Sequence, residues 1–169
     1  MKLEIRDINA CHPSAPPGSV PAIKKMSLQI GSGEQVALIG PSGAGKTTLL
    51  QVLSCTLKPL GGAIELQGQQ PWQLSKRKLQ KLRGQLIVAP QVPPLPPRQR
   101  VITSILAGRL PAMSLMQSIK SMFYPVDIPA AHSALSKLDL PEKIFERVDR
   151  LSGGERQRVG LARLFVSPA

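Results

Sequence analysis

The N-terminal half of the chain alternates between short apolar runs and turn-forming residues. Residues 3–8 and 26–30 alternate apolar and polar side chains, which is typical of strands with one buried face. Residues 35–40 (QVALIG) and 85–91 (QLIVAPQ) are short continuous apolar runs, which predict fully buried strands of a parallel sheet. The sequence GGAIELQG predicts a turn followed by a strand at residues 64–66.

The other periodic segments have helical spacing. A helix is predicted from Gly45, because Leu49, Leu50, Val52 and Leu53 share one side. Residues 75–84 (SKRKLQKLRG) predict a basic helix with its cations around Leu79 and Leu82, and such a charge run is ordinarily a solvated face. Further helices are predicted at residues 101–110, 130–138 and 152–166, and an amphipathic, flexible segment is expected at residues 111–125 between the first two.

Composition adds limits to this pattern. The 169 residues fit one domain, and only 3% of them are aromatic, so the core must be aliphatic. The net charge of +12 favours nucleotide, nucleic acid or an anionic membrane as a partner, although a solvated basic surface is equally compatible with it. Cys11 and Cys55 have no metal-ligand spacing around them and are interpreted as free thiols. We expect no signal peptide and no membrane-spanning helix.

The sequence GPSGAGKTT lies between a predicted strand and a predicted helix and has the spacing of a phosphate-binding loop. Glycines let successive backbone N–H groups turn toward an anion, and the helix start adds partial positive charge at the same point. Lys46 is then expected to reach the β- and γ-phosphates of a nucleotide, and the Thr47 hydroxyl to bind Mg²⁺. The predicted nucleotide-binding residues are Gly40, Pro41, Ser42, Gly43, Ala44, Gly45, Lys46, Thr47 and Thr48.

A second phosphate-facing helix start is predicted at LSGGERQR, residues 151–158. Ser152 followed three residues later by Glu155 forms a capping-box pattern, and Gly153 and Gly154 would let a phosphate approach the backbone. An ordinary capped helix is the alternative. Together with the loop at 40–48, this peptide resembles the signature of ATP-binding-cassette ATPases. The resemblance implies that Ser152, Gly153, Gly154 and Gln157 contact an ATP molecule bound to a second such domain.

The same resemblance covers the whole chain and gives Gln91 a role. Gln91 ends the predicted strand between the two motifs, where the family has a glutamine that contacts Mg²⁺ and the attacking water. By itself Gln91 would be an ordinary polar strand end. Pro90 stands before it where an aromatic residue is usual, so the loop is expected to be stiffer. His12 is the nearest candidate for the adenine-stacking residue, and a solvated loop histidine is the alternative.

The fold implied by the resemblance is an α/β P-loop NTPase with a RecA-like parallel sheet, N-terminal antiparallel strands and a helical subdomain. We expect a nucleotide-binding core at residues 1–91, a helical subdomain at 92–151 and a signature helix at 152–169. In the family a hydrophobic strand ending in Asp-Glu follows the signature, and this sequence stops before it at LFVSPA. Since the general base is absent, we expect a fragment of a longer ATPase that binds ATP–Mg²⁺ but scarcely hydrolyses it.

The stretches VITSILAGRL, FYP and LSGGERQRVGLAR resemble the phosphonate-importer branch of the family, although Ser104 stands where that branch usually has asparagine. Importers for phosphate, methionine or amino acids are similar enough to be alternatives. The implied function is ATP-driven uptake of a phosphonate or similar oxyanion on the inner face of the plasma membrane. The implied partners are a second ATPase domain, membrane permease subunits and, indirectly, a solute-binding protein, with no nucleic acid. The alternatives are a non-catalytic nucleotide-binding regulator or remnant, and a cassette ATPase that acts on nucleic acid.

Overall fold

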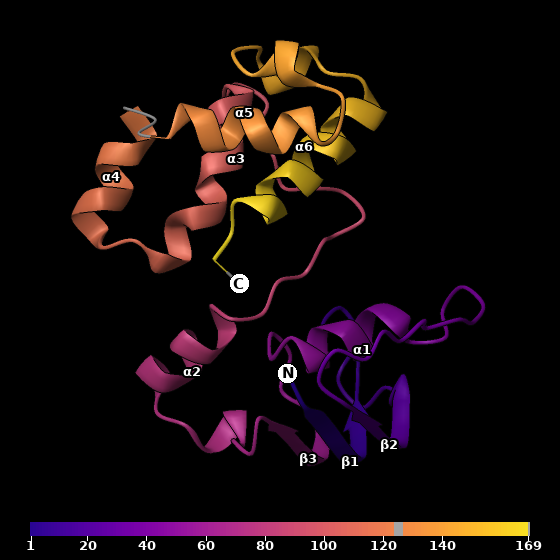
Figure 1. Ribbon diagram of the computed structural model, residues 1–169. Coiled ribbons are helices and arrows are strands. Elements are labelled where there is room, and N and C mark those ends of the chain that lie inside the picture. Colours follow the sequence, from indigo (N-terminus) through magenta and orange to yellow (C-terminus); the bar gives the residue numbers. More distant parts are fainter. Residues whose placement is uncertain (124–126, 169) are drawn as a thin grey trace. The chain divides into compact units, whose positions relative to one another are not determined.

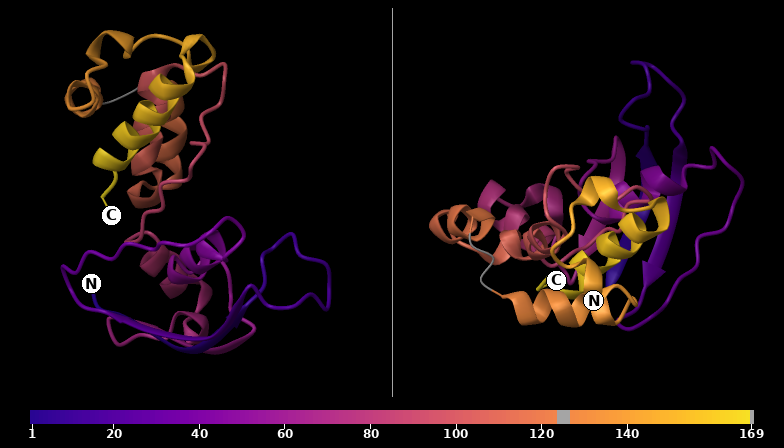
Figure 2. Two further views of the ribbon diagram at one scale, coloured as in Figure 1. Left: turned by 90° about the vertical axis from the view of Figure 1, so that its right-hand side faces the viewer. Right: turned by 90° about the horizontal axis from the view of Figure 1, so that it is seen from above.

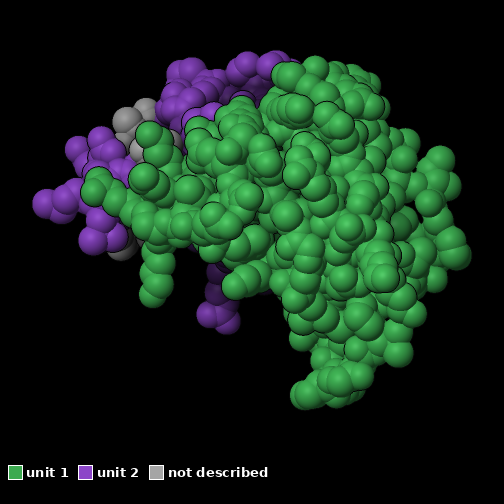
Figure 3. All heavy atoms as spheres, turned by 90° about the horizontal axis from the view of Figure 1, so that it is seen from below, with its two compact units in different colours: residues 1–86 green, residues 87–169 purple. Residues whose placement is uncertain are grey.

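The computed structural model describes residues 1–123 and 127–168 of the chain (Figure 1). It divides into two compact units, residues 1–86 and residues 87–169, coloured separately in Figure 3. Each unit has its own cluster of buried apolar side chains.

The first unit is built on a three-stranded antiparallel sheet with the order β2-β1-β3. Strand β1 is Leu3–Ala10, β2 is Ile23–Ile30 and β3 is Gly61–Leu66. Ile5 of the central strand pairs with Leu28 on one side and with Ile64 on the other. The three predicted strands in this region are thus confirmed, because one apolar face of each can be buried.

Helices cover the apolar face of this sheet, as Figure 2 shows. Helix α1 (Lys46–Leu53) contributes Leu49 and Val52 to the cluster that contains the inward side chains of β1. Helix α2 (Lys76–Arg83), which follows a 3-10 turn at Pro71–Gln73, contributes Leu82. The predicted basic helix is confirmed, with Ser75 and Gly84 as its caps.

The predictions of buried strands at residues 35–40 and 85–91 are wrong. Neither segment has strand pairing with any described residue. Most of their side chains are open to solvent, with Ile39 91% exposed and Val88 44% exposed, and Leu86 is half-buried against the cluster of the first unit. A parallel strand is held by neighbours on both edges and by covered faces, and no described segment of this chain supplies them. The parallel sheet expected from the family resemblance is therefore not formed among the described residues.

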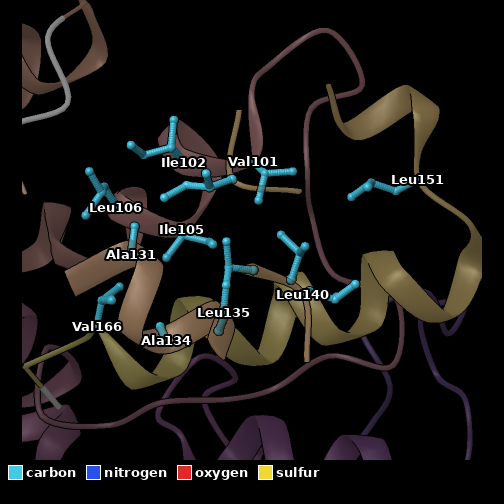
Figure 4. Packing of buried hydrophobic residues seen from close by; sticks show 13 residues of the cluster. Val101, Ile102, Ile105, Leu106, Ala131, Ala134, Leu135, Leu140, Leu151 and Val166 are labelled. Atoms are coloured by element: carbon cyan, nitrogen blue, oxygen red, sulfur yellow. The ribbon is translucent and has the colours of Figure 1, made fainter. Parts of the chain in front are cut away.

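The second unit is helical. Its elements are α3 (Val101–Leu106), a 3-10 helix at Ala107–Ala112, α4 (Leu115–Phe123), α5 (Ile128–Ser136), 3-10 turns at Pro141–Lys143 and Val148–Arg150, and α6 (Gly153–Phe165). Figure 4 shows the buried side chains of α3, α5 and α6 meeting in one cluster. Gly108 lies so close to α6 that a Cβ atom would be 2.4 Å from the Arg163 carbonyl oxygen. This close packing holds the 3-10 helix that follows α3 against α6.

The helices predicted for this half are confirmed with altered ends. The expected helix at 101–110 changes to 3-10 geometry at Ala107, shortly before Pro111, whose ring cannot continue an α-helix. In the predicted amphipathic segment 111–125 and the FYP stretch, Tyr124 and Pro125 lie outside the described residues. Within the described part of the chain, no helix has both the length and the apolar character that crossing a membrane requires.

Candidate functional site

The loop at residues 40–48 adopts a backbone that only glycine adopts easily at two positions. Gly43 has φ +81° and Gly45 has φ +83°, both in the left-handed region. A Cβ atom on Gly45 would also lie 2.9 Å from the carbonyl oxygen of Ala22. Helix α1 begins immediately after Gly45 without a side-chain cap or an acidic residue in its first turn. The start of α1 is therefore open toward an external acceptor.

Lys46 lies across this loop. Its Nζ donates hydrogen bonds to the carbonyl oxygens of Gly40, at 2.7 Å, and Pro41, at 2.6 Å. Those two bonds hold the positive charge over the loop, and no carboxylate among the described residues pairs with it. The Thr47 side chain is exposed at the helix start, whereas Thr48 is only 2% exposed and belongs to the packed side of α1. Lys46 and Thr47 thus face solvent together, and Thr48 anchors the helix.

A hollow of about 280 Å³ adjoins the loop within the first unit. Its walls come from the beginning of β2, from Leu38 and Ile39, and from residues 44–46 of the loop. The lining is mostly apolar, with Lys24 and Lys46 as its charged members. His12 does not line this hollow; it is exposed, and its Nδ1 accepts a hydrogen bond from the Ser14 N–H. The stacking role considered for His12 remains a prediction.

The start of α6 has the capping box that its sequence predicts. The Ser152 hydroxyl accepts a hydrogen bond from the Glu155 N–H at 3.3 Å, and the Ser152 N–H donates to Oε2 of Glu155 at 2.7 Å. Those bonds hold the pKa of Glu155 below its usual value. Cβ atoms placed on Gly153 and Gly154 would meet nothing within 4 Å. This helix start is therefore well ordered by its own side chains and open in front of its glycines.

The structure brings Gln91 together with the signature helix inside the second unit. Gln91 and Gln157 both line a hollow of about 190 Å³, with Pro93 and Gly160 between them. A Cβ atom on Gly160 would lie 2.5 Å from Cβ and 2.9 Å from Cγ of Pro93. The loop after Gln91 therefore packs against α6 at a position where only glycine fits.

Sequence reasoning missed this contact between Pro93 and Gly160. A glycine inside a predicted helix was the available signal, because glycine in a helix interior costs about 1 kcal/mol relative to alanine and often marks a close approach. Nothing in the sequence pointed to Pro93 as the neighbour. The partner of a packing contact is set by the fold and not by local spacing.

The second cysteine is structural in character. Cys55 is buried at the end of α1, and burial raises its pKa to about 11, so the thiol is protonated at neutral pH. Both cysteines are free thiols in the structure, as expected. Among the described residues, no group of three or more His, Cys, Asp or Glu side chains could hold a metal ion. A divalent ion at the loop would depend on the Thr47 hydroxyl together with phosphate and water oxygens.

Comparison with known proteins agrees with these features. Residues 23–169 match the family model described as ABC transporter. The chain is 62% identical over 169 residues to "Phosphonates import ATP-binding protein PhnC 2" of Albidiferax ferrireducens and 57% identical to a phosphonates import ATP-binding protein of a Polaromonas species. In both cases the match covers 100% of this chain and 61% of the relative. The chain therefore spans about three fifths of the length of these curated relatives.

Solved structures share the fold. A dimeric ATP-binding cassette in a post-hydrolysis state, bound to ADP and Pi, matches with a TM-score of 0.72 and 26% identity over 95% of this chain and 68% of that one. A bacterial Atm1-family ABC exporter with ATP bound matches with a TM-score of 0.73 and 26% identity, covering 99% of this chain and 28% of the exporter. The expected fold class, a P-loop NTPase of cassette type, is thereby confirmed.

Proposed function

The chain belongs to the ABC transporter family, and from this premise we propose that it is the ATP-binding subunit of an importer. The observation that carries the proposal is the start of α1. Glycines with positive φ, an uncapped helix end and a lysine held over the loop by two carbonyl oxygens are what a nucleotide phosphate requires.

The loop binds the phosphates through its backbone. In the proposed complex the Lys46 ammonium leaves the Gly40 and Pro41 carbonyls and pairs with phosphate oxygens, where a charge-assisted bond is about twice as strong as a neutral one. Thr47 presents its hydroxyl to the Mg²⁺ that accompanies ATP, and this ion neutralises charge on the phosphates. Thr48 stays buried and keeps α1 in place.

The signature peptide acts on a second copy of the domain. Ser152, Gly153, Gly154 and Gln157 are proposed to contact the ATP held by the phosphate loop of the partner domain. Support comes from the open space in front of the two glycines and from the exposed Ser152 and Gln157 side chains. The capping box fixes this helix start before the partner arrives, so little ordering entropy is lost on closing.

The transported solute is proposed to be a phosphonate or a similar oxyanion, because the two relatives described above are named as phosphonate importers. Permease subunits at the inner face of the plasma membrane would meet the loop after Gln91 and the helices at residues 101–138. In that region Val92 is 80% exposed, and Leu115 and Met116 of α4 are 79% and 81% exposed. These exposed apolar side chains are the proposed points of contact with the permease.

Hydrolysis needs a group that polarises the attacking water, and Gln91 alone is not a base. No hydrophobic run ending in Asp-Glu follows the signature within residues 159–169. We propose that a polypeptide of residues 1–169 alone binds ATP–Mg²⁺ and turns it over very slowly, because these residues contain no such base. The alternative function, a nucleotide-binding regulator, would use the same residues to bind ATP. It would differ from an importer subunit in that its ATP binding does not drive transport.

The test is titration of the chain with a fluorescent ATP analogue, in parallel with Lys46→Ala. Loss of a charge-assisted contact is expected to weaken binding by about ten- to a hundredfold. Lys58→Ala is the matched control, because Lys58 is an exposed lysine that follows α1 and has no recorded partner among the described residues. Equal affinity of the wild type and Lys46→Ala would contradict the proposal, as would a loss of affinity with Lys58→Ala.

A further inference from the structure

Helix α2 exposes four cations on its outer surface, with the uncharged Gln80 among them. Leu82 is buried and Leu79 is partly buried in the cluster under the sheet, so these two residues define the inner side of the helix. Lys76, Arg77, Lys78 and Lys81 are exposed on the remaining surface. At about 100° per residue, Arg77 and Lys81 lie near the centre of that outer face, with the other two on its flanks. We call these four residues the α2 basic face.

The α2 basic face is not compensated within the chain. None of its four side chains takes part in an ion pair or a side-chain hydrogen bond recorded for the described residues. The other basic residue of the helix, Arg83, is occupied differently: its Nε donates to the Cys55 carbonyl oxygen at 2.8 Å, and its guanidinium lies over the Trp72 ring at 5.6 Å. Arg83 is therefore structural and is not part of the face.

The arrangement is unfavourable for an isolated helix. Arg77 and Lys81 are like charges at i and i+4, which destabilise a helix by a few tenths of a kcal/mol. Lys76, Arg77 and Lys78 stand in the first turn, which has no acidic residue, where the helix dipole disfavours positive charge. An external array of negative charge would relieve both repulsions. The α2 basic face is consequently suited to bind a negatively charged surface and not only to remain solvated.

We propose that the α2 basic face docks on the anionic lipid headgroups of the membrane. This identification of the partner rests on the proposed function, which places the chain beside a membrane permease. A cluster of four cations on the outer side of an amphipathic helix is typical of binding to anionic lipid, and each cation contributes about a fivefold gain in partitioning. Single-stranded nucleic acid is less suited, since the nearby aromatic ring, Trp72, is partly buried and already lies under Arg83.

The experiment is co-sedimentation of the chain with vesicles of phosphatidylcholine alone or mixed equally with phosphatidylglycerol. The test variant is Lys76→Gln, Arg77→Gln, Lys78→Gln and Lys81→Gln. The matched control removes the same charge elsewhere, through Lys2→Gln, Lys25→Gln, Lys58→Gln and Arg98→Gln, all of which are exposed. Circular dichroism of both variants establishes that the helices are retained, and the ATP-analogue titration is repeated on the same samples.

Binding of the wild type to the anionic vesicles only, at least tenfold weaker binding of the test variant and near wild-type binding of the control would support the proposal. Equal losses in the two variants would overturn it, because net charge alone would then explain binding. Tighter binding to a duplex DNA probe than to vesicles, lost in the test variant, would assign the face to nucleic acid instead. Failure of ATP-analogue binding with intact vesicle binding would contradict the proposed function and leave this face unaffected.

Discussion

The two helix starts that face phosphate in the proposed function are built in opposite ways. Helix α1 begins after a glycine with left-handed backbone geometry and has no side-chain cap. The positive charge at this helix start is that of Lys46, whose ammonium group donates hydrogen bonds to two carbonyl oxygens of the preceding loop. Helix α6 begins at Ser152 with a complete capping box and an acidic residue in its first turn. The first start depends on an external anion, whereas the second is satisfied by its own side chains.

This difference fits the proposed order of events, in which the start of α1 first binds the nucleotide and the start of α6 then contacts a nucleotide held by a second domain. An uncapped start binds a phosphate strongly, because its backbone N–H donors have no side-chain acceptor to give up. Only Lys46 has to leave the two carbonyl oxygens to which it donates. A capped start binds more weakly, but it keeps its shape without a ligand. We therefore expect α1 to determine nucleotide affinity and α6 to determine whether a bound nucleotide can join two domains.

The largest effect is expected from Gly45→Ala at the start of α1. Alanine at φ +83° costs about 1–2 kcal/mol, and its Cβ atom would lie 2.9 Å from the Ala22 carbonyl oxygen. Binding of the ATP analogue is expected to be lost, measured by titration, while circular dichroism checks that the sheet remains. Gly61→Ala, in the same unit, is the control, because its φ is not positive and a Cβ atom there would meet only Asn9 Nδ2, at 3.8 Å. Unchanged affinity of Gly45→Ala for the ATP analogue would show that phosphate binding does not depend on the left-handed backbone at Gly45.

Next in size is Gly160→Ala on the body of α6. The new methyl group overlaps the Pro93 ring, and overpacking of this kind costs about 1–3 kcal/mol of unfolding free energy. Urea denaturation followed by circular dichroism measures that cost. Pro93→Gly combined with Gly160→Ala should recover most of it, since the clashing Cβ and Cγ atoms are gone.

The control for this pair is Gly154→Ala, in open space on the same helix, which should be neutral or slightly stabilising. If the double variant is as unstable as Gly160→Ala, the two positions are not coupled, and the loop after Gln91 is not held by α6.

Ser152→Ala should have a smaller effect that is confined to α6. Loss of an N-cap serine costs about 1 kcal/mol of helix stability. The start of α1 should not respond, because α1 belongs to the other compact unit and does not depend on a side-chain cap. Amide hydrogen exchange resolved by residue distinguishes the two helix starts. Ser152→Asp, which restores a capping oxygen, should recover the protection. Faster exchange at both helices would show that the cap acts on the whole chain and not locally.

The smallest effect is the pH dependence of the α6 start. The folded pKa of Glu155 is lowered by its bonds to Ser152, from an ordinary value of 4.5. The ionised carboxylate therefore stabilises α6 above the ordinary value, and the stabilisation is lost as pH falls through the lower folded pKa. Hydrogen exchange at residues 153–156 should rise in that acid range, whereas the α1 start, with no acid in its first turn, should not change.

Glu155→Gln is the control, because glutamine keeps the capping bond and does not titrate. A rise of equal size in Glu155→Gln would assign the acid sensitivity to other carboxylates of the same unit, such as Asp127 and Glu146, whose pKa values are also lowered by hydrogen bonds.

Local elements of this protein could be read from its sequence. The three strands, the basic helix and the signature helix lie where periodicity places them, because each has an apolar side that one neighbour can bury. The phosphate loop and the capping box were predicted for the same reason: their residues act within one turn of chain. The roles of His12 and Gln91, and the division of the chain at residues 91 and 151, remain predictions.

Only the tertiary structure decided what depends on distant partners. Residues 35–40 and 85–91 have the composition of buried strands, but a strand needs neighbours, and none is present among the described residues. In the same way, the sequence shows that Gly160 and Pro93 exist, and the fold alone places a Cβ position of one 2.5 Å from the other. Turn and cap chemistry is local in the chain, whereas strand pairing and close packing are long-range, and this difference separates what the sequence determined from what folding decided.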